Sequence, residues 1–116
     1  MSPCLIRCPR TASTSICLAL GKDFDHKPAS QVKQELGKEW DKFFKFTIVR
    51  DPYTRFISMF KDFVKADDLY GFVNGRLFLN DIRFKPQTYY LDIPIDYIGR
   101  FEELDKSWKF VCKKLV

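Results

Sequence analysis

The sequence predicts a small α/β domain with a mostly parallel sheet flanked by helices. Two short apolar runs, residues 4–8 and 46–49, have the composition of buried strands. Each run is followed by a polar turn and then by a helical pattern, and a further strand and helix are expected over residues 96–101 and 104–115. Strands that alternate with helices are typical of a parallel sheet with helices packed on it.

The central unit is a strand, a sharp turn and a helix. Residues 46–49 fit a strand buried on both faces. Asp51 is a good helix N-cap, and Pro52 suits the first helical position, where no amide proton is needed. The helix after it is indicated by an apolar stripe at positions i, i+3, i+4, i+7 and i+8: Phe56, Met59, Phe60, Phe63 and Val64.

This turn has the features of an anion site. A helix N-terminus carries unpaired amides and partial positive charge, Arg50 adds a cation at the turn, and Ser58 supplies a hydroxyl. Arg55 lies three residues before Ser58 and shares its helix face. The alternative is a βα unit in which Arg50 pairs with a neighbouring carboxylate for structural reasons.

The first strand is followed by a second loop of the same kind. It consists of small and hydroxyl-bearing residues with one cation: Pro9, Arg10, Thr11, Ala12, Ser13, Thr14 and Ser15. A helix is expected over residues 16–20, with Gly21 as its stop. The Walker pattern is absent, but small residues, hydroxyls and a cation can cradle an anion in the same way. The alternative is a Ser/Thr capping cluster.

The other segments are assigned more simply. A helix is expected over residues 28–36 with Gly37 at its end, and His26 just before it is either a neutral general base or a surface histidine. Residues 84–91 are expected to form a polar aromatic loop, residues 69–85 have no assignable pattern, and Gly99 is expected to make a tight exit from the third strand. The closing amphipathic helix is indicated by its apolar positions: Leu104, Trp108, Val111, Cys112 and Leu115.

Composition limits the class of protein. A chain of 116 residues with 46% hydrophobic residues and twelve Phe is expected to form one domain, residues 1–116. The net charge of +5 favours an anionic ligand, although a lysine-rich surface has the same effect. No membrane span or secretory signal is evident. The four cysteines match no metal pair and are expected to be buried free thiols, with the reactivity of Cys8 left open.

Both suspected anion loops follow strands. In parallel sheets, ligands bind outside the carboxyl ends of the strands, so the two loops are expected at one sheet edge. Two anion sites at one edge suit a ligand with two separated phosphate-like groups. The expected architecture is therefore P-loop-like and nucleotide-binding.

Several motifs together resemble the carbohydrate, Golgi-type sulfotransferases that use 3′-phosphoadenosine 5′-phosphosulfate. Residues 9–15 resemble the family's 5′-phosphosulfate loop P-K-T-[AG]-[GS]-T-S, and are nearest the heparan sulfate and uronyl 2-O-sulfotransferase branch. Residues 49–58 are similar to its 3′-phosphate motif V-R-[DN]-P-x-x-R-x-x-S. Pro86-Gln87 and residues 97–102 look like further signatures of the family.

The resemblance implies roles for particular residues. Arg50 and Ser58 would hold the 3′-phosphate, and Thr11, Ala12, Ser13, Thr14 and Ser15 would cradle the 5′-phosphosulfate. Arg10, where the family has lysine, would stabilise charge on the leaving bridging oxygen. His26 would be the base, and no metal would be required.

The resulting hypothesis is a transferase that moves sulfonate from the nucleotide donor to a carbohydrate hydroxyl. The alternative is a truncated, inactive domain that binds only adenosine 3′,5′-bisphosphate. Nucleic-acid binding ranks last, because most Phe fall at core periodicity. Relative to the family, the chain is expected to be short between residues 65 and 84 and to lack the segment after the last helix. With no anchor or signal seen, its expected location is cytoplasmic or unassigned, whereas animal members are Golgi membrane proteins.

Overall fold

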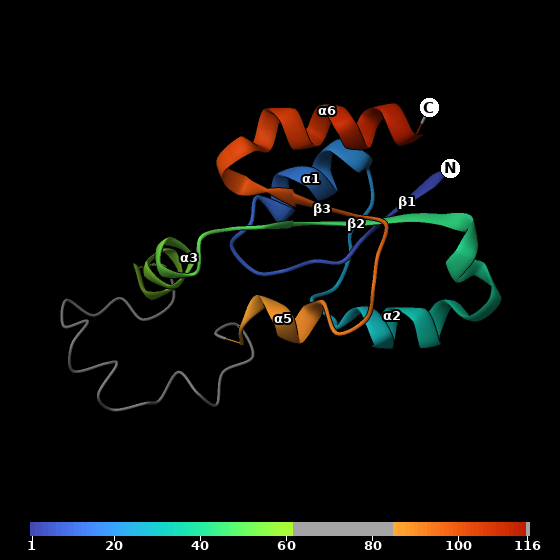
Figure 1. Cartoon of the computed structure of the whole chain (residues 1–116), viewed down its shortest axis with the longest axis horizontal. Coiled ribbons are helices and arrows are strands. Elements are labelled where there is room, and N and C mark those ends of the chain that lie inside the picture. Colours follow the sequence, from blue (N-terminus) through green and yellow to red (C-terminus); the bar gives the residue numbers. More distant parts are fainter. Residues whose placement is uncertain (62–84, 116) are drawn as a thin grey trace.

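A parallel three-stranded sheet forms the centre of the protein. The computed structural model describes residues 1–61 and 85–115, and its strands are ordered β1-β2-β3 with parallel pairing throughout. Figure 1 shows the elements in chain order: β1 (Ser2–Leu5), α1 (Ser13–Leu20), α2 (Ala29–Leu36), η1 (Gly37–Lys42), β2 (Phe43–Val49), α3 (Pro52–Met59), α5 (Gln87–Tyr90), β3 (Tyr97–Arg100), η5 (Phe101–Glu103) and α6 (Leu104–Leu115). The predicted fold class is confirmed.

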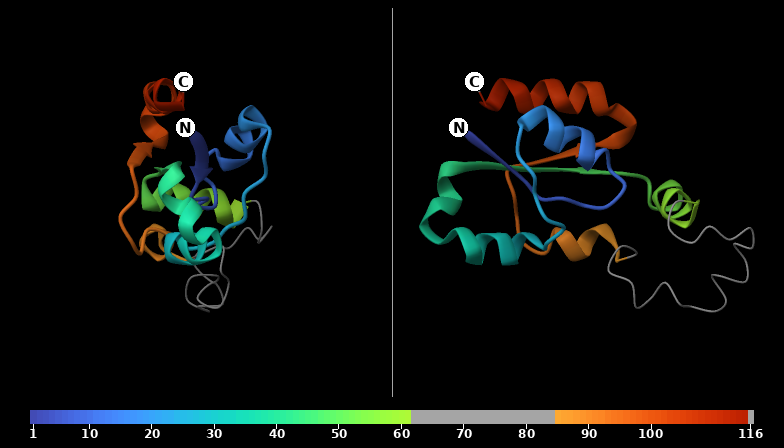
Figure 2. Two further views of the ribbon diagram at one scale, coloured as in Figure 1. Left: turned by 90° about the vertical axis from the view of Figure 1, so that its right-hand side faces the viewer. Right: turned by 180° about the vertical axis from the view of Figure 1, so that it is seen from behind.

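The described helices form a layer on each face of the sheet. Helices α1 and α6 cover one face and α2 and α5 cover the other, as both views in Figure 2 agree. Helix α3 lies beyond the end of β2, at the edge where the parallel strands have their carboxyl ends. This edge is therefore enclosed by the loops that follow β1 and β2.

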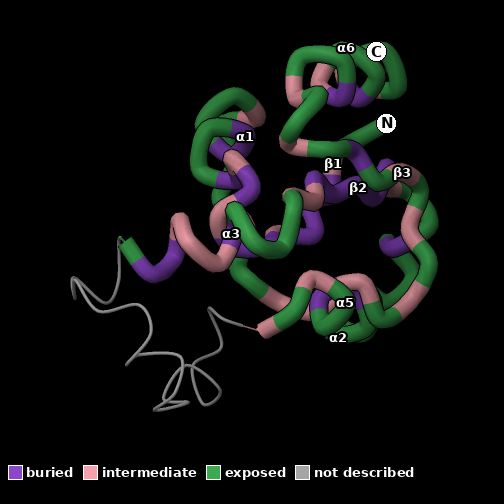
Figure 3. Tube along the Cα trace, turned by 60° about the vertical axis from the view of Figure 1, so that its left-hand side comes forward, coloured by how far each residue is buried: buried purple, intermediate pink, exposed green. Residues whose placement is uncertain are grey.

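Strand β2 is buried because it lies between β1 and β3 and under both helix layers (Figure 3). Phe44, Phe46 and Ile48 point into one core, which they share with residues of α1 and α6. The alternate residues Lys45 and Thr47 are buried on the other side. The prediction of a strand over residues 46–49 that is buried on both faces is confirmed for residues 46–48, although β2 begins earlier than expected, at Phe43.

The second core lies beneath α2 and α5. In it, buried residues of β1 and of the loop after it pack against buried residues of α2, η1 and α5: Cys4, Ile6, Cys8, Ala29, Trp40 and Tyr90. Lys45 enters this layer with its ammonium 3.2 Å from Asp96 and above the Trp40 ring. A paired carboxylate and an aromatic face compensate the cost of burying that charge.

Three predicted helix boundaries agree with the structure. Gly21 caps α1 with a φ of 68°, a left-handed conformation that glycine adopts without a side-chain clash. Gly37 likewise follows α2 with positive φ, although the chain then continues as the 3₁₀ helix η1. At α3, the Asp51 carboxylate accepts a hydrogen bond from the Thr54 amide at 2.9 Å, which confirms it as the N-cap.

Four other element predictions need correction. The first strand runs from Ser2 to Leu5 and not over residues 4–8: the Ile6 amide still donates to the Phe46 carbonyl, but the strand pairing ends at Leu5. Helix α1 begins at Ser13, three residues earlier than expected. Residues 87–90 form the short helix α5, whose single turn is too short to show a periodicity.

Gly99 is the fourth correction, because it lies inside β3 and not at a tight exit. A Cβ atom there would stand 2.7 Å from Ile48 Cδ1 and 2.7 Å from Ser107 Cβ. Glycine is required by the close approach of β3 to β2 and α6.

The described residues test the predictions for the cysteines and part of those for the apolar stripe. All four cysteines are free; Cys4, Cys8 and Cys17 are buried and Cys112 is half-buried. Phe63 and Val64 of the apolar stripe, and the unassigned segment up to residue 84, lie outside the described residues. Among residues 1–61 and 85–115, no helix has the length and apolar character needed to cross a membrane.

Candidate functional site

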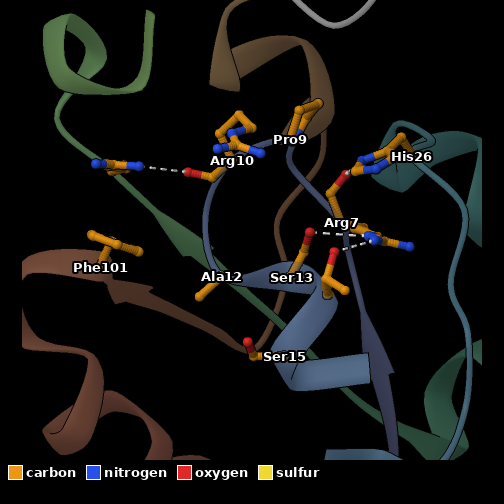
Figure 4. A pocket seen from close by; sticks show the side chains of 10 residues that line it. Arg7, Pro9, Arg10, Ala12, Ser13, Ser15, His26 and Phe101 are labelled. Atoms are coloured by element: carbon orange, nitrogen blue, oxygen red, sulfur yellow. Dashed lines mark hydrogen bonds between the residues drawn. The ribbon is translucent and has the colours of Figure 1, made fainter. Parts of the chain in front are cut away.

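A pocket of about 510 Å³ opens at the carboxyl ends of β1 and β2 (Figure 4). Among the described residues it contains three arginines and no carboxylate. Its lining combines the loop after β1, the start of α1 and residues from three other segments: Arg7, Pro9, Arg10, Ala12, Ser13, Thr14, Ser15, His26, Arg50 and Phe101. The charge of this wall favours an anionic ligand.

The loop after β1 is held in an unusual backbone conformation. Arg10 and Ala12 have φ values of 63° and 62°, which non-glycine residues rarely adopt. The Thr11 hydroxyl lies between them, is buried, and donates to the Cys8 carbonyl at 2.8 Å. Thr11 therefore fastens the loop, and its side chain does not line the pocket. Such strained residues cluster at ligand sites, where the surrounding structure compensates their cost of about 1–3 kcal/mol each.

Helix α1 directs its N-terminus at the pocket. Ala12 at the N-cap position offers no side chain to the first amides, and the first turn has no acidic residue. Ser13, Thr14 and Ser15 of that turn line the pocket. The unpaired amides and the positive end of the helix dipole make this a suitable place for a phosphate or sulfate group.

Arg7 organises these hydroxyls and was not singled out from the sequence. Its Nε donates to Ser13 Oγ and its Nη2 to Thr14 Oγ1, both at 3.0 Å, as Figure 4 shows for Ser13. Nη1 donates to the Asp23 carboxylate and to the Phe24 carbonyl. Because each hydroxyl accepts from Arg7, its own proton remains to donate to a ligand. The available signal was an arginine at the end of an apolar strand.

Arg50 lies between the two predicted anion sites. Its Nη1 donates to the Arg10 carbonyl at 3.4 Å, and its guanidinium carbon lies 4.2 Å from the centre of the Phe101 ring. Within the described part of the chain, no carboxylate forms an ion pair with Arg50. The structural alternative, an Arg50–carboxylate pair, thus has no support in these residues.

The second predicted anion site adjoins the first. A pocket of about 440 Å³ is lined by Arg50 and by residues of α3 and its extension: Tyr53, Thr54, Ile57, Ser58 and Lys61. Arg10 reaches toward it from the other loop, and its Nε donates to Ser58 Oγ at 2.9 Å. The structure therefore brings Arg10, Arg50 and Ser58 together, as the two-site prediction requires.

Arg55 has a different place from the one its spacing suggested. It is buried, and its Nε donates to the Pro9 carbonyl at 2.9 Å while Nη2 donates to the Lys85 carbonyl at 3.1 Å. Burial lowers the pKa of its guanidinium. Although Arg55 precedes Ser58 by three residues, it braces the loop after β1 from behind and does not line either pocket.

His26 lines the same pocket as Arg7. Its Nδ1 lies 3.2 Å from the Arg7 carbonyl, which is only an acceptor, so Nδ1 carries the proton and Nε2 has the free lone pair (Figure 4). Partial burial is the main cause that lowers the pKa of His26 below 6.5. It outweighs the hydrogen bond to the Arg7 carbonyl and the nearby carboxylates of Asp23 and Asp25, all of which raise this pKa. The imidazole is therefore neutral at pH 7 and able to accept a proton.

The described residues of this region support neither an activated cysteine nor a metal site. Burial raises the pKa of the Cys8 thiol above 9.0, and its sulfur contacts the Thr47 hydroxyl at 3.6 Å, so Cys8 is a packed thiol and not an activated nucleophile. Across the described ranges, no three His, Cys, Asp or Glu side chains are grouped so as to hold a metal ion.

Comparison with known proteins agrees with this geometry. A family model described as "Sulfotransferase family" matches residues 8–93, which include both anion loops, His26 and Gln87. No curated protein and no solved structure matches the chain. Residues 97–102, which resemble a further family signature, lie beyond the matched range. The match spans well over half of the chain, and the protein therefore belongs to the sulfotransferase family.

Proposed function

We propose that this protein transfers a sulfonate group from 3′-phosphoadenosine 5′-phosphosulfate to a hydroxyl of a carbohydrate. The family supports sulfonate transfer in general. The observation that carries the donor assignment is the shared position of Arg50: it lines both pockets, and its Nη1 is 3.4 Å from the Arg10 carbonyl. A ligand with two separated anionic groups fits two adjoining cationic pockets.

The residues of the site suit such a donor. Arg50 and Ser58 hold the 3′-phosphate in this proposal, and the amides and hydroxyls of residues 11–15 hold the 5′ group. The Thr11 hydroxyl is already bonded to Cys8, so Thr11 contributes its backbone and the hydroxyls come from the residues after it. Arg10 stabilises the negative charge that develops on the bridging oxygen.

His26 acts as the general base in the proposed reaction. Its Nε2 takes the proton of the acceptor hydroxyl while that oxygen forms a bond to sulfur. The bond between sulfur and the bridging oxygen breaks, and the products are a sulfate ester and adenosine 3′,5′-bisphosphate. Sulfuryl transfer should resemble phosphoryl transfer, in which the protein mainly positions groups and stabilises charge.

The proposal also specifies a carbohydrate as the acceptor of the sulfonate group. It is supported by the likeness of residues 9–15 to the loop of the 2-O-sulfotransferase branch. The second candidate is a domain that binds adenosine 3′,5′-bisphosphate without turnover. It is favoured by Arg10, because the fork of a guanidinium does not reproduce the point charge of the family's lysine.

Calorimetry with adenosine 3′,5′-bisphosphate tests the nucleotide site, and a transfer assay with labelled donor tests the reaction. Binding together with transfer to a glycan is expected. Binding without transfer to any glycan would favour the second candidate. Absence of binding would overturn the nucleotide assignment itself.

A further inference from the structure

The backbone of Arg50 is held by a side chain from a distant segment. The Gln87 carboxamide accepts from the Arg50 amide through Oε1 and donates to the Arg50 carbonyl through Nε2, both at 2.7 Å. The reverse orientation of the carboxamide would place its NH₂ group against the Arg50 amide and its oxygen against the Arg50 carbonyl, so only this orientation satisfies both hydrogen bonds. Gln87 thus makes the pair of bonds that a neighbouring strand makes in an antiparallel ladder.

The next residue is held in the same way. The Asp51 amide donates to Glu102 Oε1 at 2.7 Å. The pairing of β2 with β3 ends at Val49 and Arg100, so these two side chains continue the backbone hydrogen bonding beyond the sheet. Phe101, beside Glu102, lies against the guanidinium of Arg50.

Neither Gln87 nor Glu102 is among the residues that line the two pockets. Their bonds go to backbone atoms at the point where the chain leaves β2 and enters α3. They therefore fix the direction in which the Arg50 side chain leaves the backbone, without facing a ligand. A small rotation there would move the guanidinium away from both pockets.

We propose that Gln87 and Glu102 are positioning residues, which form a side-chain clamp that holds Arg50 in place for the 3′-phosphate. This inference rests on the proposed function. It assigns the clamp mainly to the 3′-phosphate end of the nucleotide. The loop of residues 9–15 contacts Arg50 through the Arg10 carbonyl at 3.4 Å, but Arg7 and Arg55 hold it as well.

The test compares two nucleotides that differ at the site of Arg50. Adenosine 3′,5′-bisphosphate has the 3′-phosphate and adenosine 5′-monophosphate lacks it. Gln87→Met keeps the length of the side chain and removes both hydrogen bonds. It should weaken binding of the bisphosphate roughly five- to thirty-fold and change binding of the monophosphate less than about two-fold. In an Arg50→Ala background the same substitution should have no further effect.

Glu102 provides a second variant in an exposed position, so its substitution is expected to leave the fold intact. Glu102→Leu removes the acceptor for the Asp51 amide and should weaken bisphosphate binding selectively. Glu102→Gln keeps an acceptor oxygen and should restore most of that binding. Gln34→Met, on the exposed side of α2, is the matched control for Gln87→Met and should bind both nucleotides like the wild type.

The outcomes separate the two levels of the proposal. If the wild type does not bind the bisphosphate, both the proposed function and the clamp are wrong. If the wild type binds and Gln87→Met and Glu102→Leu bind equally well, the clamp alone is overturned. Equal losses for both nucleotides would show a general structural role and would also overturn it.

Discussion

Four arginines near the carboxyl ends of β1 and β2 have different roles because their surroundings differ. Arg55 is buried and bonded to backbone carbonyls, so it supports the loop. Arg7 donates to two hydroxyls and to the Asp23 carboxylate, so it orients the first turn of α1. Arg10 and Arg50 face the pockets. A guanidinium contributes to ligand binding only where its donors are directed at the ligand position.

Arg50 carries the most direct prediction at this scale. Arg50→Ala should weaken binding of adenosine 3′,5′-bisphosphate by about 1.5–3 kcal/mol, because a charge-assisted contact is lost. Calorimetry measures the change. Arg100→Ala removes the same charge from an exposed site outside both pockets and should bind like the wild type. An unchanged affinity in Arg50→Ala would contradict the assignment.

His26 should affect turnover and not binding. His26→Ala should lower turnover by roughly 10²–10⁴-fold, the usual contribution of a general base, and keep the affinity for the bisphosphate. The pKa of His26 is lowered from 6.5, so the neutral, active form persists below pH 6.5. Wild-type activity should fall only as the pH drops through that lower pKa, and His26→Ala should lose this acid limb. A variant with wild-type turnover would exclude His26 as the base.

At the scale of elements, helix ends were predictable where a capping residue marks them. Asp51 and Pro52 mark the start of α3, and Gly21 marks the end of α1, because caps depend on a few neighbouring residues. The role of Gly99 was not predictable. Its closest contacts, Ile48 and Ser107, come from other elements, so the turn expected from its residue type was wrong.

Gly99 therefore allows a test of packing that is separate from the site. Gly99→Ala should destabilise the protein by about 1–3 kcal/mol, because its Cβ would meet Ile48 and Ser107 at 2.7 Å. Urea unfolding measures the loss. Ala12→Gly is the comparison variant. Because glycine adopts a positive φ without strain, this substitution should not lower the stability of the protein. Equal stability of Gly99→Ala and the wild type would show that β3 and α6 can move apart.

At the scale of the whole molecule, function depends on the sheet bringing separate loops to one edge. The two pockets combine residues from the loop after β1, α1, the segment before α2, the turn after β2, α3 and η5. A ligand that contacts several of these segments should bind the folded protein and not the unfolded chain. Binding and stability are therefore linked.

This linkage predicts how ligand binding changes the stability of the whole protein. At a bisphosphate concentration of 100 Kd, the free energy of unfolding should rise by about 2.7 kcal/mol. Thermal unfolding with and without the ligand measures the shift. In Arg50→Ala, the same ligand concentration should produce a smaller rise. No shift at concentrations where calorimetry detects binding would mean that the ligand also binds the unfolded state.

The strands, most helix ends and the two small-residue loops could be inferred from the order of residues, because short apolar runs, helical spacing, caps and small-residue turns act within a few positions. The pairing of Arg10 with Ser58, the use of Arg55 behind the loop and the clamp on Arg50 were decided only by folding. They join residues that are 48, 46 and 37 positions apart in the chain. Such contacts have no local signature, because packing of the sheet and its two helix layers determines which distant side chains meet.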